Sequence, residues 1–100
     1  MPRVIVTPRA DADIVAILDY LTRTAGARVT AKYADAIDEA IAGLEGMPGT
    51  AAPRPALGPN IRITIVKPYL IIHEHERGDE ALYVLRVVHG RRNITAEMLK

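Results

Sequence analysis

Residues 84–94 read VLRVVHGRRNI, an apolar run that leads directly into one histidine, one glycine and two arginines. Side chains of a strand alternate between its two faces. This alternation predicts one face made of Tyr83, Leu85, Val87 and His89, and another made of Leu82, Val84, Arg86 and Val88. Arg86 is then a lone cation among apolar neighbours. It must either pair, for example with Glu74 or Glu76 of an adjacent strand, or reach an anion or a partner.

Gly90 and the two arginines after it follow this strand. A glycine lets the chain turn without the steric penalty of a Cβ atom. Arg91 and Arg92 are then expected to project from the sheet edge, as forked donors suited to a carboxylate or a phosphate. A merely solubilising role and a contact role both remain open for this pair.

Three strand-like runs are predicted at residues 61–66, 69–76 and 81–89, separated by turns at Lys67-Pro68 and Arg77-Gly78-Asp79. Upstream, Val4–Thr7 is a short β-branched run, and Thr7-Pro8 suits a helix entry with Thr as N-cap. Apolar residues then recur at helical spacing in residues 10–21 and 29–44, with Gly26 between them. These two stretches predict an antiparallel helical hairpin.

The connection at residues 46–60, GMPGTAAPRPALGPN, is rich in proline and glycine and is predicted to form neither helix nor sheet ladder. Residues 94–100 favour a short final helix, capped by Asn93 or Thr95. The order of strand, helical hairpin and three-stranded antiparallel meander predicts an α+β fold. In it, one helix layer covers one face of a small, mostly antiparallel sheet, and residues 1–100 form a single domain.

Composition limits the possible functions. The chain is 49% hydrophobic and 25% charged, which is typical of a globular protein, and it contains no cysteine, which excludes disulfides, thiolate zinc sites and cysteine nucleophiles. No stretch resembles a signal peptide or a membrane span, so we expect a cytoplasmic protein. Residues 1–53 carry five Lys or Arg and seven Asp or Glu, whereas residues 54–100 carry eight and five. This modest basic bias predicts one anion-facing patch at most.

Two sets of residues could carry chemistry. His73 and His75 share a strand face, but no third ligand is evident, so we expect a surface histidine pair, no metal and no cofactor. Metal-free RNA cleavage needs a base, an acid and cations around the phosphorane. The chemically eligible residues are His89, Glu74, Arg62, Arg86 and Arg91. No motif supports serine hydrolysis, NTP hydrolysis or hydride transfer.

The element order, the connection MPGTAAPRPALGPN and the strands PYLIIHEHE and LYVLRVVHGRRNI resemble the ParE/RelE toxin family of type II toxin–antitoxin modules. The resemblance covers nearly the whole chain. It implies a compact toxin, neutralised by a cognate ParD-like antitoxin whose tail wraps around it in a hetero-oligomer.

Departures from the RelE pattern separate the two branches of this family. Ribosome-dependent RNases of the RelE branch place an arginine where this chain has Leu70, carry further charged residues matched only by Arg62, and have an aromatic residue after the last basic cluster. This chain has no aromatic residue beyond Tyr83. The resemblance is therefore nearer to ParE, which implies a non-catalytic inhibitor of DNA gyrase.

On the ParE interpretation, target or antitoxin is contacted through cationic residues and the tail at 94–100. The candidate contact residues are Arg62, Arg86, His89, Arg91 and Arg92. The alternative is a RelE-like endoribonuclease that uses His89, Arg86, Arg91 and Arg62. A degenerate scaffold that only binds antitoxin is a third hypothesis.

Overall fold

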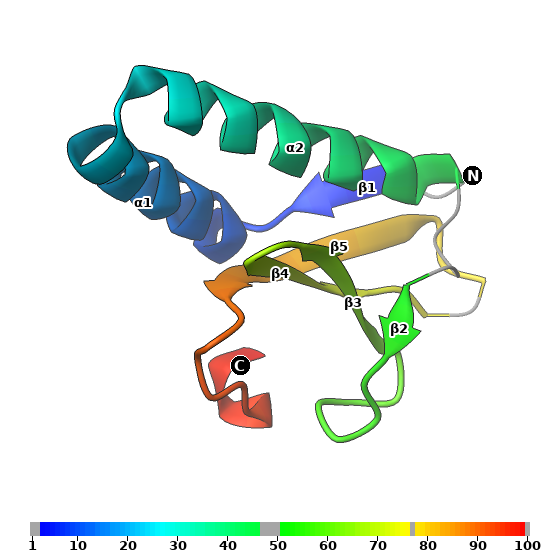
Figure 1. The fold of residues 1–100 in the computed structure, drawn as a ribbon. Coiled ribbons are helices and arrows are strands. Elements are labelled where there is room, and N and C mark those ends of the chain that lie inside the picture. Colours follow the sequence, from blue (N-terminus) through cyan, green and yellow to red (C-terminus); the bar gives the residue numbers. More distant parts are fainter. Residues whose placement is uncertain (1–2, 47–50, 77, 100) are drawn as a thin grey trace.

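The computed structural model describes residues 3–46, 51–76 and 78–99. Its elements are β1 (Arg3–Val6), α1 (Pro8–Ala25), α2 (Ala27–Gly46), β2 (Ala52–Pro53), β3 (Ile61–Val66), β4 (Tyr69–Glu74), β5 (Ala81–His89) and the 3-10 turn η1 (Ala96–Leu99). The sheet order is β1-β5-β4-β3-β2; β1 runs parallel to β5, and all other neighbours are antiparallel. Both helices cover one face of this sheet (Figure 1). The predicted α+β fold is confirmed.

The ends of the first helix form as the sequence predicts. The Thr7 hydroxyl accepts a hydrogen bond from the Ala10 N–H at 3.2 Å, and Pro8 occupies the first helical position. Gly26 ends the helix at φ 89°, and its N–H donates to the Leu21 carbonyl at 3.1 Å. Only glycine adopts this left-handed backbone without strain, so α2 can begin at once in the opposite direction.

The connection contains a strand that the sequence did not predict. Ala52 and Pro53 pair with Ile63 and Arg62 of β3, so the expectation of no sheet ladder in residues 46–60 is wrong at this point; residues 47–50 of that prediction lie outside the described residues. A proline is tolerated here because β2 is the last strand of the sheet, and a proline with no N–H to donate can occupy an outer edge. The Arg54 N–H continues the pairing with a bond of 2.9 Å to the Ile61 carbonyl.

Apolar side chains are buried on both faces of the sheet. The helix-facing core includes Ile37, Ile71 and Leu82. On the other face, four residues of the sheet lie under the β2–β3 connection and the chain end: Ile61, Ile63, Ile72 and Val88. Leu57, Ile94, Met98 and Leu99 pack against them. The C-terminal segment therefore covers this second face of the sheet, as the two helices cover the first (Figure 1).

A β-bulge divides β5. Ile72 of β4 pairs with Arg86, whereas the next residue, His73, pairs with Val84, so Leu85 is an extra residue in the ladder. Val84 and Val87 therefore both pack in the helix-facing core, whereas Leu85 and Val88 pack on the opposite face. The predicted strict alternation is wrong beyond Leu85, because one inserted residue exchanges the faces of all that follow.

Candidate functional site at the end of the last strand

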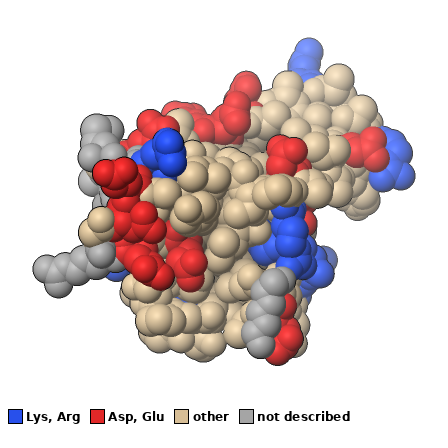
Figure 2. All heavy atoms as spheres, turned by 180° about the vertical axis from the view of Figure 1, so that it is seen from behind, with Lys and Arg blue, Asp and Glu red and all other residues tan. Residues whose placement is uncertain are grey.

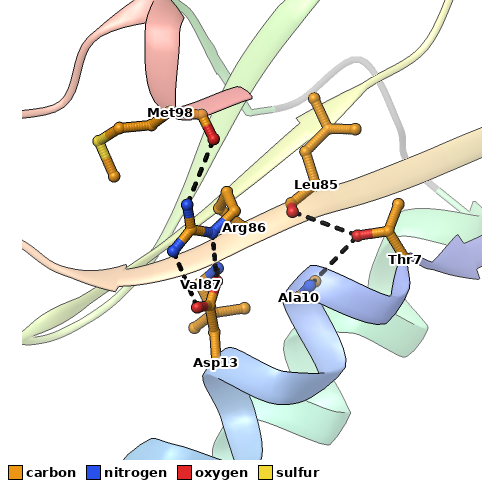
Figure 3. Close-up of polar contacts among 7 residues, drawn as sticks. All are labelled: Thr7, Ala10, Asp13, Leu85, Arg86, Val87 and Met98. Atoms are coloured by element: carbon orange, nitrogen blue, oxygen red, sulfur yellow. Dashed lines mark hydrogen bonds and ion pairs between the residues drawn. The ribbon is translucent and has the colours of Figure 1, made fainter. Parts of the chain in front are cut away.

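The first residues of α1 cover the edge of β5 where β1 ends. β1 pairs with β5 only as far as Val84. Beyond it, the Thr7 hydroxyl donates to the Leu85 carbonyl at 3.2 Å, and the Asp13 carboxylate accepts from the Val87 N–H at 3.0 Å (Figure 3). Side chains of the helix thus replace the missing strand as partners of the bulged backbone.

Arg86 is held inside this network. Its Nε and Nη2 donate to the two carboxylate oxygens of Asp13 at 2.7 and 3.0 Å, and its Nη1 donates to the Met98 carbonyl at 3.2 Å (Figure 3). The side chains of Arg86 and Asp13 are only 9% and 16% exposed. The hydrogen bonds to Asp13 raise the pKa of Arg86 despite its burial. Arg86 is therefore charged, and its Nε, Nη1 and Nη2 each donate a hydrogen bond within the chain.

The partner of Arg86 differs from the prediction. The sequence suggested Glu74 or Glu76, but the bulge brings Arg86 to the edge of β5 that faces α1, where Asp13 lies. Asp13 stands off the apolar stripe of its own helix and lies 73 residues from Arg86 in the sequence. No local pattern marks it, so sequence reasoning missed it.

His89, Gly90, Arg91 and Arg92 form a tight, hydrogen-bonded turn. The Gly90 N–H donates to the Pro68 carbonyl at 2.8 Å, the Arg91 N–H to Nδ1 of His89 at 3.0 Å, and the Arg92 N–H to the His89 carbonyl at 3.0 Å. A Cβ on Gly90 would lie 3.1 Å from the Pro68 oxygen, so the close backbone approach at this turn favours glycine. Both arginines are exposed, and neither forms an ion pair within the described residues.

A hollow of about 400 Å³ lies between α1 and this turn. The Tyr69 ring forms part of its wall and meets the His89 ring edge-on, with 5.7 Å between centroids and 83° between planes. Its lining also includes Arg92, Asp13 and Tyr20 of α1, which is 57% exposed. Because the carboxylate of Asp13 is already bound by Arg86, the mostly apolar lining and the cation of Arg92 suit an apolar anchor beside a carboxylate.

Arg62 lies apart from this turn. It is opposite His73 in the ladder, whereas His89 is opposite Tyr69, four positions along β4, which corresponds to about 13 Å of strand. The Nη1 of Arg62 donates to the Ala51 carbonyl at 2.8 Å. The structure therefore gathers His89, Arg91 and Arg92 but does not bring Arg62 to them.

The histidine pair is not a surface pair, because His73 is only 1% exposed. Its Nε2 lies 2.9 Å from the Thr64 hydroxyl. Burial, followed by the charges of Arg62 and His75, lowers the pKa of His73 to about 4. The expectation of two surface histidines is wrong for this residue, whose face of β4 is the one that the helices cover. Among the described residues, no three His, Asp or Glu side chains are grouped to hold a metal ion.

Comparison with solved structures gives a match to a chain described as "Chromosomal ParDE TA system from P. aeruginosa", with a TM-score of 0.75 and 24% sequence identity. The match covers 89% of this chain and 96% of the other. It shows that the two chains share the same small α+β fold. No curated protein matches the chain in sequence.

The family model described as the ParE toxin of the type II toxin–antitoxin system parDE matches residues 4–94. The chain therefore belongs to the ParE toxin family, as the resemblance indicated, and is the toxin of a ParDE-type module. This membership implies a ParD-type antitoxin as its partner. No helix in the described part of the chain has the length and apolarity needed to cross a membrane.

Proposed function

We propose that this ParE toxin inhibits DNA gyrase by binding, through the cationic turn of Arg91 and Arg92. The observation that carries the proposal is the placement of these two exposed arginines on a hydrogen-bonded turn directly after a buried strand. Their backbone is held by the bonds at Gly90 and His89, so little backbone conformational entropy is lost when they bind. Such a surface can stabilise one state of a larger machine by differential affinity alone.

The internal engagement of Arg86 supports a non-catalytic mode of action. An RNase of the alternative type would place cations around the transition-state phosphorane. Here Arg86 is bound to Asp13 and Met98, and Arg62 lies elsewhere on the sheet. Of the four residues that the RNase alternative would use, His89 and Arg91 are the two that are close neighbours. The Nδ1 atom of His89 already accepts the Arg91 N–H.

The hollow beside Arg92 is the proposed contact for the antitoxin. An apolar side chain would fill the space between Tyr20 and Tyr69, and an adjacent acidic residue would meet Arg92. Occupation of this hollow would also cover the cationic turn, because Arg92 belongs to both. Binding of the antitoxin would thereby block the target, within a toxin–antitoxin hetero-oligomer in the cytoplasm, where gyrase acts.

The test is a supercoiling assay with purified gyrase and the antitoxin-free protein. We expect inhibition and accumulation of gyrase-cleaved DNA, both reduced at least tenfold by the double variant Arg91→Gln/Arg92→Gln. The matched control is Arg23→Gln/Arg28→Gln, which removes two exposed arginines near the tip of the helical hairpin. Unimpaired supercoiling at saturating protein would exclude gyrase as the target. Cleavage of transcripts on translating ribosomes would favour the RNase instead.

A further inference from the structure

The outer edge of β1 carries backbone groups that have no partner among the described strands of the sheet. Within residues 3–46, 51–76 and 78–99, β1 is the terminal strand on this side, and β5 is its only neighbour. The N–H groups of Arg3 and Thr7 donate to the carbonyls of Glu80 and Val84, at 2.6 and 3.1 Å. In a parallel ladder, alternate residues point both backbone groups to the same side. Arg3, Ile5 and Thr7 therefore face β5, whereas Val4 and Val6 direct their N–H and C=O groups outward.

The same two valines line a groove between β1 and α2. It has a volume of about 550 Å³, and Ile41 and Ala42 contribute further apolar surface from α2. Its length on the helix side, from residue 35 to 45, corresponds to about 15 Å of helix. The four residues of β1 span about 13 Å. An extended segment of four to six residues would thus lie along both walls.

Carboxylates determine what kind of segment fits. Asp35, Asp38, Glu39 and Glu45 line the groove on α2, all four are exposed, and within the described residues none is paired with a cation. Figure 2 shows acidic side chains gathered on this side of the molecule, toward the end where α2 finishes and the N-terminus lies. Side chains on one face of an added strand would point at these carboxylates. A second copy of this chain would bring a second set of carboxylates, which repel the first.

We propose that the outer edge of β1 is a docking site for an extended segment of a partner protein that carries lysine or arginine alternating with apolar residues. The segment adds to the sheet as a sixth strand. Val4 and Val6 supply backbone hydrogen bonds, Ile41 and Ala42 supply apolar contact, and the carboxylates of α2 select for positive charge. This site uses neither the cationic turn nor the hollow beside Arg92, so it stands or falls independently of the proposed function.

The experiment is a titration of the isotope-labelled full chain with a synthetic hexapeptide of alternating lysine and valine, followed by NMR amide exchange. We expect slowed exchange at the Val4 and Val6 amides, with little change at Arg3 and Ile5, which already donate to β5. The variant Val6→Pro removes one outward N–H without removing a ladder bond. It should weaken binding at least fivefold, with its circular dichroism spectrum unchanged.

Charge neutralisation provides a second test, because it leaves the backbone of β1 intact. Asp35→Asn/Asp38→Asn/Glu39→Gln should weaken peptide binding at least tenfold. The matched control, Asp11→Asn/Asp19→Asn/Glu76→Gln, removes three exposed acids elsewhere and should change it less than twofold.

Three results would overturn the proposal. In the first, the peptide binds without protecting the Val4 and Val6 amides. In the second, the triple variant of the groove and its matched control lose affinity for the peptide equally. In the third, β1 proves to be the interface of a dimer that the peptide does not dissociate.

Discussion

Asp13 and Arg86 lie 73 residues apart in the sequence and form a two-bond ion pair, with N···O distances of 2.7 and 3.0 Å. The same carboxylate accepts the Val87 N–H, and the same guanidinium donates to the Met98 carbonyl. One pair of side chains therefore joins the first helix, the bulged strand and the C-terminal turn. It positions the elements that carry the cationic turn, and it occupies the Nε/Nη2 fork of Arg86 with an internal carboxylate.

Replacement of Asp13 by alanine should be strongly destabilising, because it leaves a nearly buried guanidinium and the Val87 N–H without their acceptor. We expect a loss of about 3 kcal/mol in the free energy of unfolding, measured by urea denaturation. The matched control is Asp19→Ala, which removes an exposed partner of Arg23, with side chains 68% and 69% exposed. This control should lose less than about 1 kcal/mol. Equal losses would show that the buried pair has no special role.

Thr7 has two functions at the start of α1, since its hydroxyl caps the helix and also donates to the Leu85 carbonyl. Thr7→Val keeps the shape but removes both bonds, and we expect a loss of about 1–2 kcal/mol. Thr7→Ser should retain most of the stability. Thr24→Val removes only an exposed bond to the Tyr20 carbonyl and should change stability by less than about 0.5 kcal/mol. A thermal or urea melt of the three variants checks this order, which a neutral Thr7→Val would contradict.

Much of the fold could be predicted because its signals are local. Thr7-Pro8 and Gly26 mark helix ends by chemistry that depends on a few neighbouring residues. The helical spacing and the strand-like runs indicate the layers in the same way. The bulge at Leu85 could not be predicted, because Val84, Leu85, Val87 and Val88 are all apolar and fit either face, whether or not one residue is inserted. Its position depends on the register with β4, which is a tertiary property.

The candidate site was predictable only in part, for the same reason. Arg91 and Arg92 could be recognised because they directly follow a strand and need no partner to be exposed. Arg86 could be recognised as an isolated cation, but its partner Asp13 depends on how α1 packs against the edge of β5. His73 was misjudged because alternation alone does not say which face of β4 the helices cover.

Two glycines should respond in opposite ways to alanine. At Gly90, a Cβ would lie 3.1 Å from the Pro68 carbonyl oxygen, a backbone atom that moves only with the turn. Gly90→Ala should therefore cost about 1–2 kcal/mol and disturb the placement of Arg91. At Gly43, inside α2, a Cβ meets nothing within 4 Å, so Gly43→Ala should stabilise by about 0.5–1 kcal/mol. Urea denaturation and NMR shifts of residues 89–92 test both expectations, and a stabilising Gly90→Ala would refute the first.

Buried His73 should make the fold sensitive to mild acid. Its pKa falls from 6.5 to about 4 on folding, because burial, reinforced by Arg62, penalises the charged ring. As the pH falls, the unfolded chain therefore takes up the proton before the folded chain does. The free energy of unfolding is highest above pH 6.5 and declines as the pH falls toward 4. The loss between pH 7.5 and 4.5 should be about 2.5 kcal/mol. His73→Gln does not titrate but can still bond the Thr64 hydroxyl, and it should show a much smaller loss in urea melts at the two pH values. If both proteins lost the same stability, carboxylates elsewhere would be the source of the acid sensitivity.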